Sequence, residues 1–290
     1  MKIGLAGTGR MGSAIAQRLA SLGHEMMVWN RTTDKARSLG FPVAATPQAL
    51  ASGCEMVISI LTDAKAVSQV YDEMLAGDVK GKLFIEMSTV RPDVQKALSQ
   101  RVLSRGGRFI ECPVGGTIGP AKEGKLFGFV GGEAADVARA KPVLDQMCRR
   151  VEHVGPIGSG ARFKLAINLP LLVYWQALGE ALSLVRDLHI EPTRLMDILA
   201  DTSGAPNMLK NRAATLAGAL AGKEPSQVTV NVDTMKKDLS EMVEEMRSLG
   251  WSSLVAQAAL EGFAHASKAG LGAKDCSMLP VSWSSKPQKL

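Results

Sequence analysis

The chain has 290 residues, 46% of them hydrophobic, which is enough apolar content for the buried cores of two ordinary domains. Its formal net charge of +6 is spread over the whole length, and only 4% of residues are aromatic, so the composition lacks the basic clusters and stacking platforms of nucleic-acid-binding proteins. We therefore expect a small anionic ligand and no nucleic-acid partner.

Cysteine spacing and the apolar runs bear on metals and membranes. The four cysteines are widely separated, no CxxC pair occurs, and no histidine stands at metal-ligand spacing, so we expect reduced thiols and no metal site. No basic leader precedes the first predicted strand, and we expect no apolar run long enough to span a bilayer. The expectation is a cytoplasmic protein without a membrane partner.

The first predicted strand runs directly into a glycine-rich turn. Residues 2–6 form a short apolar run, glycines follow at positions 7, 9 and 12, and residues 13–22 have helical periodicity. This is the dinucleotide-binding fingerprint, in which glycines allow a tight turn, a close approach of the pyrophosphate, and packing of helix on strand. The turn residues assigned to the cofactor are Gly7, Gly9, Arg10, Met11 and Gly12.

The second predicted strand, residues 25–29, ends in Asn30, Arg31 and Thr32. An NAD-selective site would carry Asp or Glu here to accept hydrogen bonds from the ribose hydroxyls. No carboxylate is present to repel a 2′-phosphate, and the Arg31 guanidinium can pair with one while Asn30 and Thr32 add hydrogen bonds. NADP(H) is therefore favoured over NAD(H), with an ordinary surface arginine as the alternative for Arg31.

Alternating strands and helices continue through the first half of the chain. Predicted strands at 56–61, 83–86 and 108–111 are separated by predicted helices at 64–75 and 92–105. The pattern predicts an α/β Rossmann domain with a doubly wound, mostly parallel sheet. Residues at or just past strand ends could line the nicotinamide half of a cofactor, or their hydroxyls could cap the next helix instead: Leu61, Thr62, Ser88 and Thr89.

A glycine- and proline-rich loop follows the strand at 108–111. Its backbone N–H groups suit a carboxylate, and the candidate substrate-binding residues are Gly115, Gly116 and Thr117. A plain tight connection within the sheet is an equal alternative. Cys112 is interpreted as a packing residue, since no histidine lies close to it in sequence.

The character of the chain changes near residue 157. A last strand at 151–154 precedes one long predicted helix at 158–190 with a kink at Pro170, and helices are predicted for most of the remainder, at 192–199, 207–220, 232–249 and 253–269. Residues 281–290 are predicted to be a frayed polar tail. The sequence thus predicts two domains, residues 1–157 and an all-helical part, residues 158–290.

Two polar residues stand near the start of the long predicted helix. Lys164 and Asn168 are four residues apart and share one helical face. A lone lysine is usually solvated, but this one is surrounded by an almost continuous apolar run, which favours a partly desolvated ammonium suited to proton transfer. The pair is therefore the candidate catalytic constellation.

Four motifs occur in an order that resembles the β-hydroxyacid dehydrogenase family: the turn at 7–12, Pro113 to Gly116, residues 158–168 with Lys164 and Asn168, and Lys237-Asp238-Leu239. The family includes 3-hydroxyisobutyrate dehydrogenases, tartronate semialdehyde reductases, and glyoxylate and succinic semialdehyde reductases. Membership implies a Rossmann domain, a helical dimerisation domain, and a homodimer or homotetramer. The segment 272–277 resembles the family's closing segment.

The resemblance also implies roles for residues. Lys164 is the catalytic lysine, Asn168 orients the substrate, the loop at Gly115, Gly116 and Thr117 holds the substrate carboxylate, and Lys237 reaches the cofactor. Asn30, Arg31 and Thr32 look most like the NADPH-using glyoxylate and succinic semialdehyde reductase branch.

Three residues depart from the family pattern: Gly115, where many members carry Ser, Val230 and Pro170. They bear on the choice of substrate more than on the reaction, which the resemblance implies to be hydride transfer between nicotinamide and a small aldehyde or keto acid. Two other readings remain open, an imine reductase and a non-catalytic nucleotide-binding module.

Overall fold

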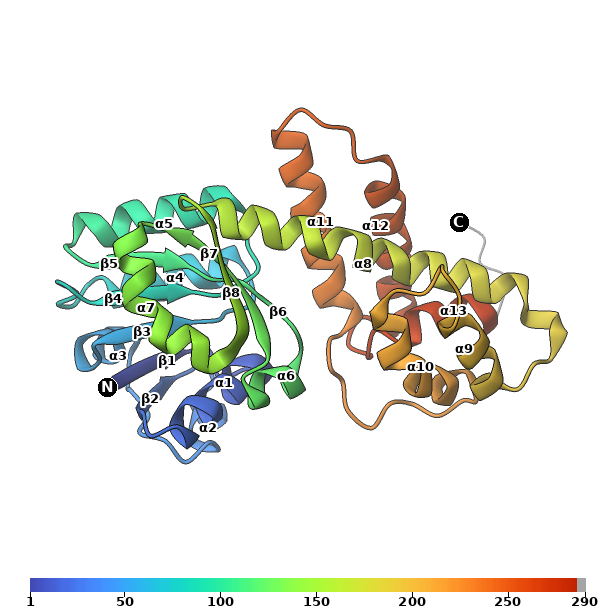
Figure 1. Ribbon diagram of the computed structural model, residues 1–290, viewed down its shortest axis with the longest axis horizontal. Helices are drawn as coiled ribbons and strands as arrows, with labels where there is room; N and C mark the ends of the chain where they lie inside the picture. The colour runs from blue at the N-terminus through green and yellow to red at the C-terminus, as the bar shows by residue number, and fades with distance from the viewer. Residues whose placement is uncertain (286–290) are drawn as a thin grey trace. The chain divides into compact units, whose positions relative to one another are not determined.

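The computed structural model describes residues 1–285 and divides the chain into two compact units, Met1–Leu165 and the part from Ala166 onward. The first unit is built on one sheet of eight strands (Figure 1). The strands are β1 (Lys2–Ala6), β2 (Glu25–Trp29), β3 (Met56–Ser59), β4 (Leu83–Glu86), β5 (Arg108–Glu111), β6 (Val114–Gly115), β7 (Leu126–Gly132) and β8 (Cys148–Gly155).

The sheet is mostly parallel. Its strand order is β2-β1-β3-β4-β5-β7-β6, with β8 paired to β7, and the first five strands along this path run parallel. β7 is antiparallel to both β5 and β6, and β8 is parallel to β7. Every parallel strand from β1 to β5 therefore delivers its C-terminal residues to the same edge of the sheet, where open α/β sheets bind ligands.

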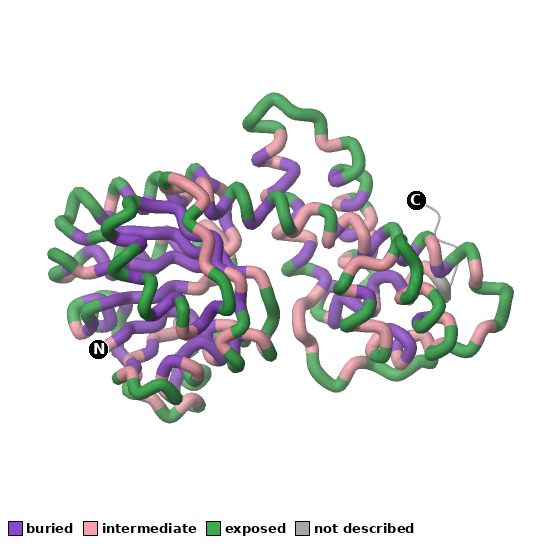
Figure 2. The backbone as a smooth tube through the Cα atoms, viewed as in Figure 1, coloured by how far each residue is buried: buried purple, intermediate pink, exposed green. Residues whose placement is uncertain are grey.

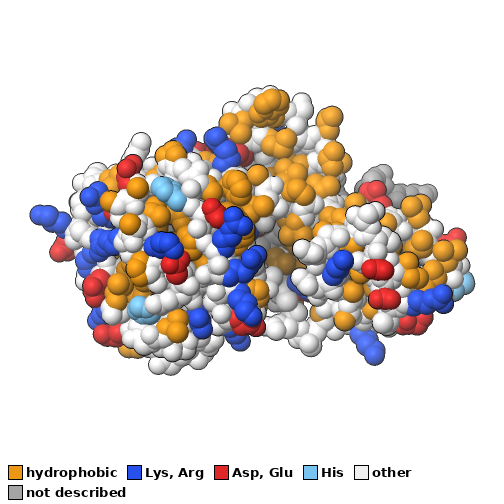
Figure 3. Space-filling model, in the orientation of Figure 1, with side chains coloured by type: hydrophobic (Ala, Val, Ile, Leu, Met, Phe, Trp, Pro, Cys, Tyr) orange, Lys and Arg blue, Asp and Glu red, His pale blue; other side chains and the backbone are white. Residues whose placement is uncertain are grey.

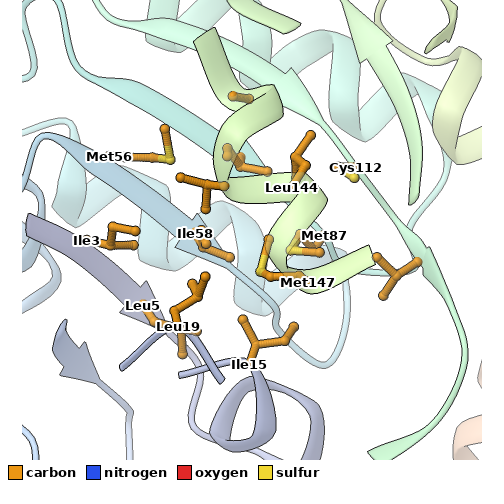
Figure 4. Packing of buried hydrophobic residues seen from close by; sticks show 14 of the residues in the cluster. Ile3, Leu5, Ile15, Leu19, Met56, Ile58, Met87, Cys112, Leu144 and Met147 are labelled. Atoms are coloured by element: carbon orange, nitrogen blue, oxygen red, sulfur yellow. The ribbon is translucent and has the colours of Figure 1, made fainter. Parts of the chain in front are cut away.

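Helices cover both faces of this sheet. One face carries α1 (Arg10–Ser21), α6 (Ile118–Glu123) and α7 (Ala134–Met147), and the other carries α3 (Pro47–Gly53), α4 (Ala64–Met74) and α5 (Pro92–Ser104); the short α2 (Thr33–Arg37) follows β2. Side chains alternate between the two cores along β3, where Ile58 belongs to one core and Val57 to the other. Figure 4 shows the core that contains Ile58. β3 and β4 are consequently buried at every position (Figure 2).

The second unit is helical. It contains most of α8 (Ser159–Leu184), a 3₁₀ turn η1 (Arg186–Leu188), α9 (Pro192–Ala200), α10 (Asn207–Leu220), α11 (Val232–Ser248), α12 (Leu254–Ala266), a π-helical turn η2 (Ser267–Leu271) and α13 (Met278–Ser285). α9 packs on α10, and α11 packs on α12. The fold is therefore an α/β Rossmann unit followed by a helical unit, as the sequence predicts.

Two expectations from the sequence require correction, and four helices, α2, α3, α6 and α7, have no counterpart among the predicted elements. The long helix ends at Leu184 rather than near residue 190. The polar tail expected from residue 281 is helical through Ser285 in α13, where the Trp283 indole N–H donates to Gln176 Oε1 at 3.2 Å. The last part of that predicted tail, residues 286–290, lies outside the described residues.

α8 also corrects the expectation about apolar runs. It is a 26-residue helix that is long and apolar enough to cross a membrane by length and composition alone. However, Leu165, Leu172, Trp175, Leu178 and Leu182 on this helix are buried within the protein. A core helix buried on one side accounts for the same composition.

Candidate active site

The glycine turn between β1 and α1 is shaped by backbone contacts. Gly7 has a φ of +98°, and a Cβ there would lie 2.2 Å from the Ile60 carbonyl oxygen, while a Cβ on Gly12 would lie 1.9 Å from the Gly7 carbonyl oxygen. A side chain is impossible at either position without moving the backbone. Gly9, by contrast, faces open space at the N-terminus of α1.

The turn fits a dinucleotide. The first turn of α1 carries no acidic residue, Arg10 is exposed beside it, and Met11 is partly buried. The buried hydroxyl of Thr8 has no hydrogen-bond partner within the described part of the chain. An open helix N-terminus with an unpaired hydroxyl next to it suits the pyrophosphate of a nicotinamide cofactor.

Asn30 ties the end of β2 to the glycine turn. Its side-chain Oδ1 accepts a hydrogen bond from the Thr8 N–H at 3.1 Å, and its Nδ2 donates to the Thr32 carbonyl at 3.0 Å. Arg31 and Thr32 are exposed next to it. Asn30 therefore ties the glycine turn to the end of β2, and Arg31 is an exposed cation beside it.

The ends of β3 and β4 are joined through a hydroxyl. The Leu61 N–H donates to Ser88 Oγ at 2.8 Å, and Ser88 is only 1% exposed. Thr62 is exposed and Thr89 is half-buried. Ser88 thus fixes the Leu61 backbone at the C-terminal edge of the sheet, while Thr62 and Thr89 keep some contact with solvent.

Sequence reasoning missed a buried carboxyl at this edge, Glu86 at the end of β4. It accepts hydrogen bonds from the Ser59 hydroxyl and from the Ser88 N–H, the latter at 2.6 Å, and Tyr71 OH lies 2.9 Å from Ser59 Oγ. Burial raises the pKa of Glu86 to about 7, against the opposing effect of these donors. An acidic residue ending an otherwise apolar strand was the available signal.

A second missed carboxyl, Glu111 at the end of β5, contacts the start of α8. It accepts hydrogen bonds from the backbone N–H groups of Gly158 at 2.5 Å, Gly160 at 2.9 Å and Ala161 at 3.2 Å. Burial raises the pKa of Glu111 to about 7, while the three N–H groups act in the opposite direction. Because the partners lie about 50 residues away, no local pattern in the sequence reveals the contact.

Lys164 and Asn168 both lie on α8, the lysine at the end of the first compact unit and the asparagine at the start of the second. Lys164 is 8% exposed and Asn168 is half-buried. Residues four apart project from the same side of a helix, so the structure retains the shared face that the sequence predicts. The buried lysine is the exception to the usual solvated state of this residue type.

The candidate substrate loop follows β5. Gly115 ends the short strand β6, which pairs with β7, and a Cβ there would meet Phe129 at an ordinary 3.7 Å. Gly116 has a φ of +128°, and a Cβ on it would lie 2.8 Å from Leu126 Cδ2. Gly116 and Thr117 are exposed, and Thr117 precedes α6 without capping it. The loop therefore presents backbone and one hydroxyl to solvent.

Lys237 lies on α11 in the second unit, where its Nζ is 2.6 Å from Asp238 Oδ1. The closing segment at 272–277 contacts the residues that precede this helix, because Asp275 accepts a hydrogen bond from the Thr229 N–H at 2.8 Å. Within the segment, Asp275 also accepts one from the Ser277 N–H at 3.0 Å. Asp275 also forms an ion pair with Arg212. Asp275 therefore holds the segment that leads into α11, which carries Lys237.

In the described part of the chain, neither the cysteine thiols nor a group of metal-ligating side chains forms a competing site. All four cysteines are buried and free, and burial raises the pKa of the Cys112 thiol, so it is a packing residue. Among residues 1–285, no cluster of three or more His, Cys, Asp or Glu side chains is suited to a metal ion.

Comparison with known proteins gives consistent matches to both halves of the chain. Residues 2–155 match the family model for the NAD binding domain of 6-phosphogluconate dehydrogenase. Residues 158–281 match the model for the NAD-binding domain of NADP-dependent 3-hydroxyisobutyrate dehydrogenase. Together the two models cover most of the chain.

Two curated relatives and one solved structure illustrate the kinds of protein that the chain resembles. Glyoxylate/succinic semialdehyde reductase 1 of Arabidopsis thaliana is 30% identical over 283 residues, covering 96% of each chain. The cytokine-like nuclear factor N-PAC of Mus musculus is 31% identical over 201 residues, covering 68% of this chain and 36% of N-PAC. The fold matches that of 3-hydroxyisobutyrate dehydrogenase from Salmonella typhimurium with a TM-score of 0.87 at 23% identity, over 97% and 99% of the two chains.

Proposed function

Because the chain belongs to the β-hydroxyacid dehydrogenase family, we propose that it uses NADPH to reduce a small carboxylate-bearing aldehyde or keto acid to its hydroxy acid, and catalyses the reverse reaction with NADP⁺. The chain is an NAD(P)-dependent oxidoreductase that acts on CH–OH groups. The observation that carries the proposal is the burial of Lys164, at 8% exposure, on the helix that also bears Asn168.

A bound nicotinamide supplies the hydride, and the protein supplies the proton and the orientation. In the reductive direction the Lys164 ammonium donates a proton to the carbonyl oxygen as the carbonyl carbon gains hydride, and solvent then reprotonates the amine. In the oxidative direction the neutral amine accepts the hydroxyl proton. Asn168 holds the reacting oxygen, because a carboxamide can donate to it without competing for the proton.

The substrate carboxylate is assigned to the loop of Gly115, Gly116 and Thr117. Backbone N–H groups and one hydroxyl favour an anion without adding a fixed charge. The same preference for small anions agrees with the formal charge of +6. Lys237 is assigned to the cofactor.

NADPH is preferred to NADH in this proposal because Arg31 is exposed after β2 and residues 30–32, directly after that strand, include no carboxylate. The guanidinium can pair bidentately with a 2′-phosphate. The glyoxylate and succinic semialdehyde reductase from Arabidopsis thaliana supports the same class of substrates, small acids with an aldehyde carbon.

The experiment is to measure turnover with NADPH and with NADH against aldehydes, keto acids and cyclic imines. We expect turnover with small carboxylate-bearing aldehydes or keto acids and a higher kcat/KM with NADPH. Turnover of imines alone would favour an imine reductase, and nucleotide binding without turnover would favour a non-catalytic role. The buried Lys164 argues against the non-catalytic role, because nucleotide binding alone needs no proton donor there.

We also propose that the second unit forms the interface of a homodimer or homotetramer. Around the connection between α11 and α12, Trp251, Leu254 and Val255 are 71%, 82% and 66% exposed, and Figure 3 shows hydrophobic side chains gathered over this part of the chain. An exposed apolar group of this kind marks association sites. Sedimentation should show that the parent protein is an oligomer and that Trp251→Glu dissociates it. A variant with the same oligomeric mass as the parent would contradict the assignment of this surface as the interface.

A further inference from the structure

We propose that Glu111 is a positioning residue that holds the first turn of α8 and thereby sets the location of Lys164, an inference that rests on the proposed role of Lys164. Glu111 belongs to β5, and none of the motifs that identify the family assigns a role to it. Its carboxylate is fully buried.

The carboxylate takes the place of a helix cap. Gly158 precedes α8 and accepts a hydrogen bond at its carbonyl from the Arg162 N–H at 3.1 Å, which makes it the capping position, yet it has no side chain. Glu111 accepts instead from the N–H groups of Gly158, Gly160 and Ala161. These are groups that a helix leaves unpaired at its start, and a negative charge there is also favoured by the helix dipole.

Glycines surround the Glu111 carboxylate and the start of α8, and side chains at these positions would clash or strain the backbone. A Cβ on Gly131 would lie 2.2 Å from Glu111 Oε1, and a Cβ on Gly160 would lie 2.4 Å from the Phe129 carbonyl oxygen. Gly158 has a φ of +97°, which other residues rarely adopt. Glycines on β7 and at the start of α8 therefore allow the carboxylate and the helix backbone to approach closely.

The cap is connected to Lys164 by the geometry of the helix. Gly160 and Ala161 lie four and three residues before Lys164, one turn away on the same side. Loss of the cap would loosen the turn on which the lysine stands, and a displacement of about 1 Å at a catalytic group can lower a rate about 10²-fold. Glu111 acts through the helix, without touching the substrate.

The test is a double-mutant cycle with Glu111→Ala and Lys164→Ala. We expect Glu111→Ala to lower kcat about 10²-fold in the presence of Lys164 and by less than about twofold in the Lys164→Ala background, with the Kd for NADPH unchanged within about twofold. Glu111→Gln keeps one acceptor oxygen but turns an amide toward an N–H group, so its kcat should fall about tenfold. If Glu111→Ala lowered kcat by the same factor with Lys164 present and in the Lys164→Ala background, the proposal would be overturned.

Hydrogen exchange separates this idea from the proposed function. Amides in a peptide covering residues 158–165 should exchange faster in Glu111→Ala and Glu111→Gln, whether or not Lys164 is catalytic. If exchange is unchanged, the capping role is wrong; if exchange rises but Lys164→Ala keeps full kcat, the proposed function is wrong. Either result overturns the positioning role.

The matched control is Glu191→Ala. Glu191 caps α9 through the N–H groups of Thr193 and Arg194, each at 2.9 Å, and α9 carries no proposed site residue. Its loss should weaken α9 while leaving kcat within about twofold of the parent. A fall in kcat as large as that of Glu111→Ala would show that a lost cap anywhere disturbs activity, which would contradict the specific role of Glu111.

Discussion

Glu86 and Glu111 stand opposite one another in the register of the parallel strands β4 and β5, and both side chains are fully buried. Each carboxyl satisfies donors that belong to a different segment: Ser59 and Ser88 for Glu86, and the start of α8 for Glu111. Glu86 also raises the pKa of Glu111. The C-terminal edge of the sheet therefore carries two interacting acids.

The first prediction concerns the free energy of unfolding as a function of pH. Burial raises the pKa of both carboxyls from an ordinary 4.5 to about 7, so between these values the native state holds protons that the unfolded chain has released. Stability from the protonated acids is full below about pH 4.5 and is lost as pH rises through 7, by at most about 3 kcal/mol for each. Urea unfolding at pH 5, 6, 7 and 8 measures this loss.

Glu86→Gln is the matched variant, since a carboxamide resembles the protonated acid and cannot ionise. Its unfolding free energy should depend less on pH than that of the parent over the same range. The same dependence of unfolding free energy on pH in the parent and in Glu86→Gln would contradict the raised pKa of Glu86.

The second prediction concerns the cofactor. Arg31→Glu replaces a cation with an anion next to the expected 2′-phosphate, and a charge-assisted contact is worth roughly 1.5–3 kcal/mol. The affinity for NADPH should fall about 10- to 100-fold, and the affinity for NADH should change much less, as measured by fluorescence titration. The control is Arg37→Glu, at an exposed position of α2 where the arginine pairs with Asp34. This variant should change neither the affinity for NADPH nor that for NADH. Equal losses for the two cofactors in Arg31→Glu would rule out a phosphate contact.

The third prediction compares neighbouring glycines of the substrate loop. A Cβ added to Gly115 would make only ordinary van der Waals contacts, whereas Gly116 combines a φ of +128° with a close approach to Leu126. Gly115→Ser should keep the melting temperature and alter kcat/KM among small acids, because it adds a hydroxyl to the loop. Gly116→Ala should lose about 1–3 kcal/mol of stability. Similar stabilities for the two variants would mean that the loop conformation differs from that described.

The strands and the glycine turn could be predicted from sequence because their signals are local. The apolar run at 2–6 and the glycines at 7, 9 and 12 specify the first β-turn-α unit without reference to any distant residue. The Lys164 and Asn168 spacing is equally local, since helical periodicity alone places both on one face. α7 was missed because Pro142 interrupts its pattern, although the helix continues through that residue.

The two buried acids could not be predicted because their roles depend on tertiary contacts. Glu111 meets Gly158, Gly160 and Ala161 only after β5, β7 and α8 have packed together, and Glu86 meets Ser59 across two strands. The side chain of Asn30, a predicted cofactor contact, also bonds to Thr8 and Thr32, which its position in the sequence does not reveal. Sequence patterns predict where ligands bind, whereas the groups that orient those positions become visible only in the structure.

The most direct test of the account is the rate of hydride transfer in Lys164→Ala, measured in a single turnover with NADPH and the best substrate, together with the Kd for NADPH. General acid catalysis is typically worth about 10²–10⁴-fold, so the rate should fall by that factor with the Kd unchanged. Lys141→Ala, an exposed α7 lysine paired with Asp145, is the control and should retain the parental rate. An undiminished rate in Lys164→Ala would contradict the assignment of this buried lysine as the proton donor.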